Sequence, residues 1–148
     1  MELIFILLYG TLLLVSIASL LFFVHSLFCC LTEVQESNRS MSPWVLWLNV
    51  LPFINLVCLP YSVLMLKKSL LNEYASRGFE SKYSDMGGIL GMSAYLLYLV
   101  SNFIPMIGFI TGLISMVLWI SYWVMMVRIK KELIALKMGN GSIVSESP

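Results

Sequence analysis

Three long stretches without charged residues constrain this chain more than any other feature. No Asp, Glu, Lys or Arg occurs in residues 3–31, 41–66 or 86–127. An apolar stretch of about 18 or more residues without charge is typical of a membrane-spanning helix. The last of the three stretches is long enough for two spans joined by a tight turn. We therefore predict four transmembrane helices, at about residues 3–31, 44–66, 87–104 and 105–127.

The composition agrees with this interpretation. The chain of 148 residues is 59% hydrophobic and 11% charged, whereas about 25% of residues are charged in an ordinary soluble domain. The predicted fold class is therefore an all-α integral membrane protein with four transmembrane helices as two antiparallel hairpins, in a single domain over residues 1–138. Residues 139–148 are short, polar and rich in Gly and Ser, and we expect a disordered cytoplasmic tail there.

The positions of the basic residues predict an orientation. Arg39 is the only basic residue between the first two spans, four lie between the second and third, and four follow the last. Short cytoplasmic loops carry an excess of Lys and Arg. With both termini in the cytoplasm, eight of the nine basic residues are inside and only Arg39 is outside. We therefore expect both termini to be cytoplasmic.

An asparagine followed three residues later by a proline occurs twice, in LNVLPFIN at 48–55 and SNFIPMIG at 101–108. Asparagine is a good helix N-cap, and proline is tolerated in the first helical turn. The motif therefore predicts helix starts at Asn49 and Asn102. Because the stretch from Asn49 to Lys67 is shorter than that from Asn102 to Arg128, the first motif falls inside the second span, which we expect to be kinked or broken near Pro52.

The second span also carries the candidate site. We expect Asn49, Asn55 and the carbonyl groups freed near Pro52 and Pro60 to line a small polar cavity for a ligand or ion. The alternative is that these amides satisfy the break in the backbone and bind a neighbouring helix. The spans contain no ionisable group of the kind that a conduction site usually has, which favours packing.

Small residues recur at helical spacing in the last two spans. Gly87 and Gly91 begin the third span, and Gly108 and Gly112 begin the fourth. Small residues let helix backbones approach closely in lipid. We predict helix-packing faces here, either within one subunit or between subunits.

The second span resembles a pattern in uncharacterised bacterial multi-pass membrane proteins: a Trp, then Pro-x-x-Asn-Leu-Val, then Pro-Tyr. The matching residues are Trp47, Pro52, Asn55, Leu56, Val57, Pro60 and Tyr61. The resemblance covers only the second span and the residues beside it. It implies a four-helix fold in the bacterial inner membrane, but no activity.

Function is constrained mainly by what the sequence lacks. It has one His, cysteines at 29, 30 and 58 that match no metal or redox spacing, and a net charge of +1. No nucleophile is paired with a base. We therefore expect no enzyme, no cofactor and no nucleic-acid partner. The lipid bilayer and other membrane subunits, or a second copy, are the expected partners. The first hypothesis is an interaction module or accessory subunit, and the alternative is a small oligomeric transporter or pore.

Overall fold

The structure is a computed structural model and describes residues 2–79, 83 and 85–144. Its helices are α1 (Glu2–Thr32), η1 (Glu36–Asn38), η2 (Pro43–Val50), α2 (Pro52–Ser76), α3 (Gly88–Phe103) and α4 (Pro105–Val144), where η marks a 3₁₀ helix. The described residues form no strand, so the prediction of an all-helical chain is confirmed for them. α4 reaches Val144, and helix therefore covers part of the segment predicted as a disordered tail.

Within the part of the chain that the structure describes, three helices are long and apolar enough to cross a membrane, within the bounds Ile4–Thr32, Pro52–Ser76 and Ile107–Met138. α3 is apolar but has only 16 residues, a length of about 24 Å at 1.5 Å per residue. A hydrocarbon core is about 30 Å thick. By length and composition the chain is therefore a helical membrane protein with three candidate spanning helices and a shorter apolar helix.

The break expected in the second span is present. η2 ends at Val50, Leu51 has an extended backbone (φ −82°, ψ 119°), and Pro52 is the first residue of α2. A residue before proline avoids the helical conformation for steric reasons, which accounts for the extended Leu51. Pro60, in contrast, lies inside α2 without ending it.

The predicted asparagine caps are wrong. Asn49 lies within η2, and Leu51 holds the N-cap position of α2. The side chain of Asn102 donates from Nδ2 to the Tyr98 carbonyl, at 2.7 Å, within the end of α3. In both motifs the proline itself is the first helical residue, later in the chain than predicted: α2 starts at Pro52 and α4 at Pro105. The fixed φ angle of proline, rather than the asparagine side chain, therefore marks these helix starts.

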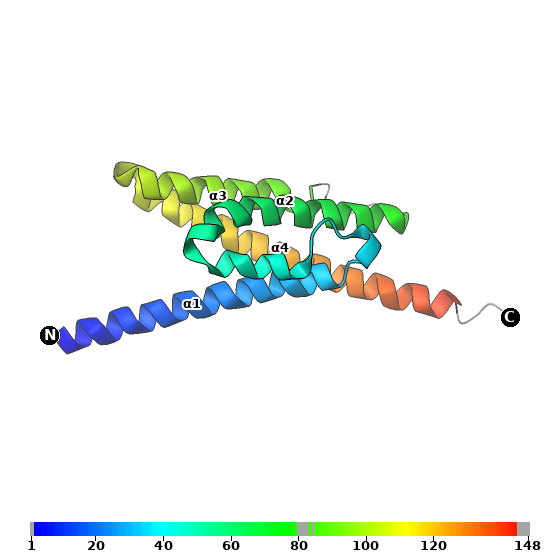
Figure 1. The fold of residues 1–148 in the computed structure, drawn as a ribbon, viewed down its shortest axis with the longest axis horizontal. Helices are drawn as coiled ribbons and strands as arrows, with labels where there is room; N and C mark the ends of the chain where they lie inside the picture. Colours follow the sequence, from blue (N-terminus) through cyan, green and yellow to red (C-terminus); the bar gives the residue numbers. More distant parts are fainter. Residues whose placement is uncertain (1, 80–82, 84, 145–148) are drawn as a thin grey trace.

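The direction of α2 differs from the prediction. η2 runs antiparallel to α1, since Trp44 lies on Phe28 and Trp47 on His25, with centroids 5.5 and 6.4 Å apart. The chain reverses at Leu51, and α2 runs back along η2 (Figure 1). α1 and α2 therefore point the same way, and the first hairpin that we predicted is not formed by two full-length antiparallel helices. The antiparallel partner of α1 is instead the short helix η2.

α3 and α4 form an antiparallel pair. Ser115 Oγ of α4 donates to the Ala94 carbonyl of α3 at 2.9 Å. α4 in turn runs parallel to α1, because Phe23 contacts Trp119 and, farther along both helices, Lys137 contacts Glu33. As a result α1, α2 and α4 end at one end of the molecule, where α3 begins (Figure 1). The start of α1 and the end of α4 lie at opposite ends of the molecule (Figure 1).

The small residues pack helices of this chain against one another. A Cβ on Gly91 would lie 2.9 Å from Val63 Cγ1 of α2 and 3.1 Å from Tyr122 of α4. Gly87 adopts a left-handed φ of 77° and also lies against Tyr122. A Cβ on Gly108 would meet the Ser101 carbonyl at 2.6 Å in the α3–α4 turn, whereas one on Gly112 would have only ordinary contacts.

The buried core gathers toward the end where α1, α2 and α4 finish. Its fully buried residues include Val24, Leu31, Leu70, Ile129 and Leu133. The N-terminal half of α1 instead projects beyond the other helices (Figure 1), and its large apolar side chains are exposed. Such a helix, apolar on every side and uncovered by its own chain, fits lipid rather than water as its surroundings.

We expect Gly91→Ala to destabilise the protein by about 1–3 kcal/mol, because the stiff Val63 side chain leaves no room for the added methyl group. Gly112→Ala is the matched control, and it is expected to be neutral or slightly stabilising because alanine is the better helix former. The measurement is reversible unfolding in mild detergent. Equal stability of the two variants would contradict the tight α2–α3–α4 contact.

Candidate functional site

Asn49 is held inside the protein by two hydrogen bonds. Its Nδ2 donates to the Leu46 carbonyl and to Ser62 Oγ of α2, both at 2.9 Å, and the residue is 1% exposed. Its Oδ1 is buried and has no partner among the described residues. The amide therefore fastens η2 to α2, the packing role that was the alternative to a ligand site.

Pro60 is accommodated by a side chain of another helix. Proline has no N–H, so the carbonyl of Leu56, four residues earlier, loses its helical partner. The Tyr95 hydroxyl of α3 donates to this carbonyl. α2 therefore continues through Pro60 because α3 replaces the missing backbone donor, as is required where no water is available.

Asn55 lies in the wall of a cavity of about 510 Å³ among α1, α2, α3 and α4. The cavity is lined by Ser19, Leu20, Phe23, Asn55, Leu59, Tyr98, Met116, Trp119, Ile120 and Trp123. Asn55 Oδ1 is buried without a hydrogen-bond partner among the described residues, and such a group costs about 1–3 kcal/mol.

The four residues predicted around one site, and Asn102 of the second motif, do not meet at this cavity. Asn55 lines it, whereas Asn49, Pro52, Pro60 and Asn102 are not among its lining residues. Asn102 is exposed at the end of α3. Sequence reasoning missed the aromatic walls of the cavity because they come from α1, α3 and α4, far from Asn55 in the chain.

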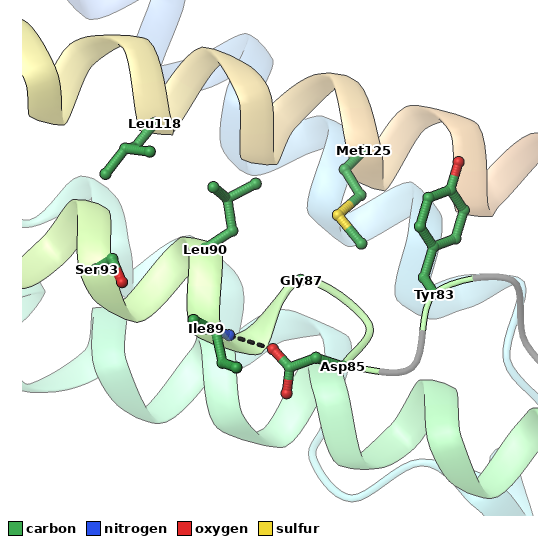
Figure 2. Close-up of a pocket in the computed structure, with 8 residues that line it drawn as sticks. All are labelled: Tyr83, Asp85, Gly87, Ile89, Leu90, Ser93, Leu118 and Met125. Atoms are coloured by element: carbon green, nitrogen blue, oxygen red, sulfur yellow. Dashed lines mark hydrogen bonds between the residues drawn. The ribbon is translucent and has the colours of Figure 1, made fainter.

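A second cavity, of about 440 Å³, lies between the start of α3 and α4 (Figure 2). Its acidic residue, Asp85, accepts a hydrogen bond from the Ile89 amide and pairs with Lys67 of α2. Partial burial opposes ionisation of Asp85, but the bonds from Lys67 and Ile89 outweigh it and hold the pKa of this carboxyl below its usual value. Asp85 is thus a charged helix cap, suited to joining α2 and α3 rather than to exchanging protons near neutral pH.

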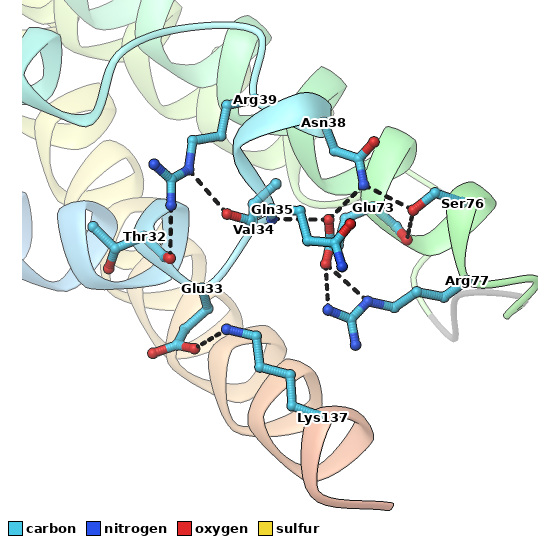
Figure 3. A network of polar contacts seen from close by, with 10 residues as sticks. All are labelled: Thr32, Glu33, Val34, Gln35, Asn38, Arg39, Glu73, Ser76, Arg77 and Lys137. Atoms are coloured by element: carbon cyan, nitrogen blue, oxygen red, sulfur yellow. Dashed lines mark hydrogen bonds and ion pairs between the residues drawn. The ribbon is translucent and has the colours of Figure 1, made fainter. Parts of the chain in front are cut away.

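A polar network joins the 33–42 segment to the end of α2 (Figure 3). Its centre is Glu73, which is fully buried and ionically paired with Arg77. Glu73 Oε2 accepts from the Gln35 amide at 3.0 Å and from Asn38 Nδ2 at 2.7 Å, and Oε1 accepts from Arg77 Nε at 2.8 Å. Every charge-bearing oxygen thus has a partner, which is the condition for burying a carboxylate.

Further bonds fix the same segment. Arg39 donates from Nε to the Val34 carbonyl and from Nη2 to the Thr32 carbonyl, both at 2.9 Å, and so caps the C-terminal end of α1. The Ser40 amide donates to Ser69 Oγ of α2 at 2.8 Å. Lys137 of α4 pairs with Glu33 at 2.6 Å (Figure 3). The i,i+4 spacing of Glu73 and Arg77 is the sequence signal that this region offered.

The described basic residues lie in the second halves of α2 and α4, just after α2, or in the segment that follows α1, and so in the part of the molecule toward which these three helices run. Eight of the nine lie in the described part of the chain: Arg39, Lys67, Lys68, Arg77, Arg128, Lys130, Lys131 and Lys137. Arg39, which the sequence analysis assigned to the opposite side, lies beside the end of α2 through Asn38 and Ser40. Lys82 falls outside the described residues.

No family model matches the chain, and neither a curated protein nor a solved structure is significantly similar to it. The resemblance of the second span to bacterial multi-pass proteins therefore stays a prediction. Among the described residues no three His, Cys, Asp or Glu side chains are grouped so as to hold a metal ion.

We expect Glu73→Gln to destabilise the protein by about 3–5 kcal/mol, because it leaves the nearly buried Arg77 guanidinium without its counter-charge. Glu36→Gln is the control: Glu36 is 92% exposed and pairs with Arg39 only at 3.7 Å, so its loss is expected to cost less than about 1 kcal/mol. Unfolding in mild detergent measures both. A Glu73→Gln variant as stable as the wild type would rule out the network as the anchor of the 33–42 segment.

Proposed function

We propose that this protein is a membrane-embedded interaction module, an accessory subunit that binds helices of other membrane proteins or of its own copies. The observation that carries the proposal is the N-terminal half of α1. Its large apolar side chains are exposed on every side. A Cβ added at Gly10 would touch nothing within 4 Å, which leaves room for a helix to approach closely.

The rest of the molecule forms a rigid base for the N-terminal half of α1. α2, α3 and α4 are joined by close glycine contacts and by the Tyr95–Leu56 hydrogen bond. The Glu73 network ties the segment that follows α1 to α2, and Arg39 of that segment bonds to the last residue of α1. The bundle thus holds one end of α1 rigidly and leaves the other half for a partner.

We further propose an arrangement in the membrane that differs from four antiparallel spans. In it α1 and α4 cross the bilayer, and the shorter α3 crosses beside α4. α2 is long enough to span, but here it forms with η2 a re-entrant hairpin that enters and leaves on one side. The position of Arg39 beside the end of α2 supports this, since all eight described cations then lie on one side. By the bias of cytoplasmic segments toward Lys and Arg, that side is the cytoplasm, and the Glu2 end of α1 faces outward.

The turn at Leu51 fits a membrane interior. Non-helical backbone survives there only when its polar groups are satisfied. The Leu51 amide donates to the Leu48 carbonyl at 3.1 Å, and the Leu51 carbonyl accepts from the Asn55 amide at 2.8 Å. The adjacent Phe53 is 88% exposed, as expected of a side chain that faces lipid.

The bacterial inner membrane is the location that we propose, on the strength of the pattern around Pro52, Asn55 and Pro60. The second candidate function is a small oligomeric transporter or pore whose second span lines a polar path. The Oδ1 of Asn55, which has no hydrogen-bond partner in the described part of the chain, favours it. Against it, Asn49 Nδ2 is used in packing and Asn102 lies elsewhere, so the amides form no continuous path.

Cysteine labelling tests the arrangement. In a background where Cys29, Cys30 and Cys58 are replaced by Ala, Ser37→Cys is expected to resist a membrane-impermeant maleimide in intact spheroplasts and to react after permeabilisation. Ser37 is exposed in the 33–42 segment, and the re-entrant arrangement puts that segment in the cytoplasm. Met138→Cys, also exposed, is the cytoplasmic control. Glu2→Cys is a second test position, since Glu2 is external in the re-entrant arrangement and cytoplasmic in the four-span one, and it is expected to react in intact spheroplasts. Labelling of the Ser37→Cys variant in intact spheroplasts, with Met138→Cys protected, would contradict the re-entrant arrangement and support the four-span one.

Native mass spectrometry after gentle detergent extraction tests the interaction module. We expect a mass greater than that of one chain, from a second copy or a copurifying membrane subunit. A photo-cross-linking residue at Leu13 of α1 is expected to capture protein, whereas one at the similarly exposed Phe109 of α4 captures lipid. A single-chain mass together with lipid-only adducts at both positions would refute the module. Solute flux through reconstituted vesicles would then support the pore.

A further inference from the structure

The cavity beside Asn55 lies near the middle of the proposed membrane. Along α2 the helical rise from Asn55 to Lys67 is about 18 Å, and along α4 the rise from Trp119 to Arg128 is about 14 Å. Each distance is close to half the thickness of a hydrocarbon core of about 30 Å. A ligand for this cavity must therefore dissolve in the membrane.

The walls of the cavity are rich in aromatic rings, supplied by Phe23, Tyr98, Trp119 and Trp123. Phe23 meets Trp119 edge to face, with centroids 4.9 Å apart. The indole Nε1 of Trp123 donates to Ser26 Oγ at 2.9 Å, so its polar group is already satisfied. These walls offer flat apolar surface, on which another ring packs well.

Asn55 supplies the polar contact. No hydrogen bond of its side chain is found among the described residues, and its Oδ1 is buried without a partner. Lipid tails carry no group that could satisfy an amide. A hydroxyl can, because it donates to an amide oxygen and accepts from an amide nitrogen, whichever the side chain turns toward it.

We propose that this cavity binds a membrane-soluble ring compound that carries a hydroxyl group, of the phenol or hydroquinone class. The ring lies among the four aromatic side chains, and the hydroxyl bonds to the Asn55 amide. The volume of about 510 Å³ is within the usual range for small-molecule sites. This binding needs one chain only, so it stands apart from the interaction module.

The test compares two probes that differ in one group, 4-octylphenol and 1-phenyloctane. Binding to the detergent-solubilised protein is followed by tryptophan fluorescence in a background where Trp44 and Trp47 are replaced by Phe, which leaves Trp119 and Trp123 in the cavity wall as the reporters. We expect saturable binding of the phenol, and a preference for it over the hydrocarbon that falls about tenfold in Asn55→Leu. Comparing the preference between variants cancels the unequal partition of the probes into micelles.

Asn102→Leu is the matched control, since Asn102 is exposed and outside the cavity, and it is expected to keep the wild-type preference. Leu59→Phe narrows the cavity without altering the Asn55 amide and is expected to weaken the binding of both probes. This variant keeps the test decisive if Asn55→Leu does not fold. The proposal is overturned if the phenol shows no saturable binding, if Asn55→Leu keeps the full preference for the phenol over the hydrocarbon, or if Leu59→Phe weakens the binding of neither probe.

Discussion

The fold depends on one constraint: in lipid, every interruption of a helix must have its backbone groups satisfied by the protein itself. Pro52 and Pro105 begin helices after a non-helical residue, whereas Pro60 removes one backbone hydrogen bond inside α2, and the constraint is met differently around each. At Leu51, before Pro52, a 3₁₀ bond to Leu48 and a helical bond from Asn55 satisfy the turn. At Pro60 the Tyr95 hydroxyl takes the place of the missing amide. Before Pro105 the Ile104 amide donates to the Val100 carbonyl and closes α3. The close contacts of Gly87 and Gly91 with α2 and α4 bring the helices near enough for such exchanges.

Much of the local structure could be predicted from the sequence. Runs without charge identify apolar helices, and proline marks where α2 and α4 begin, because both effects depend on residues adjacent in the chain. The path of the chain could not be predicted in the same way. Whether the segment after α1 returns fully or turns back at Leu51 depends on contacts such as Asn38 with Glu73, which are 35 residues apart. The predicted orientation took every apolar stretch to cross the membrane. For that reason it placed Arg39 on the opposite side of the membrane from the other cations.

The candidate site, too, could be predicted only in part from the sequence. The sequence identifies Asn55 as a costly amide in apolar surroundings, and none of the residues that the structure describes bonds to its Oδ1. The rings around it come from three other helices, and no spacing within the second span could indicate them. Asn49, with the same side chain earlier in the same segment, is instead bonded to Ser62. Two equal residues in one short segment thus have different roles because the break at Leu51 turns them toward different neighbours.

The turn at Leu51 also bears on how the chain enters the membrane during synthesis. In the proposed arrangement the segment with Glu33, Glu36 and Arg39 never passes through the bilayer, since η2 and α2 form a re-entrant hairpin that enters and leaves on the cytoplasmic side. Moving a charged side chain to the centre of a membrane costs at least about 2.5–3.5 kcal/mol. Apart from Glu2, the described sections that must be carried to the far side contain only the uncharged tip around Ile104. Insertion of α3 and α4 can thus proceed as one apolar pair, without the export of a hydrophilic loop.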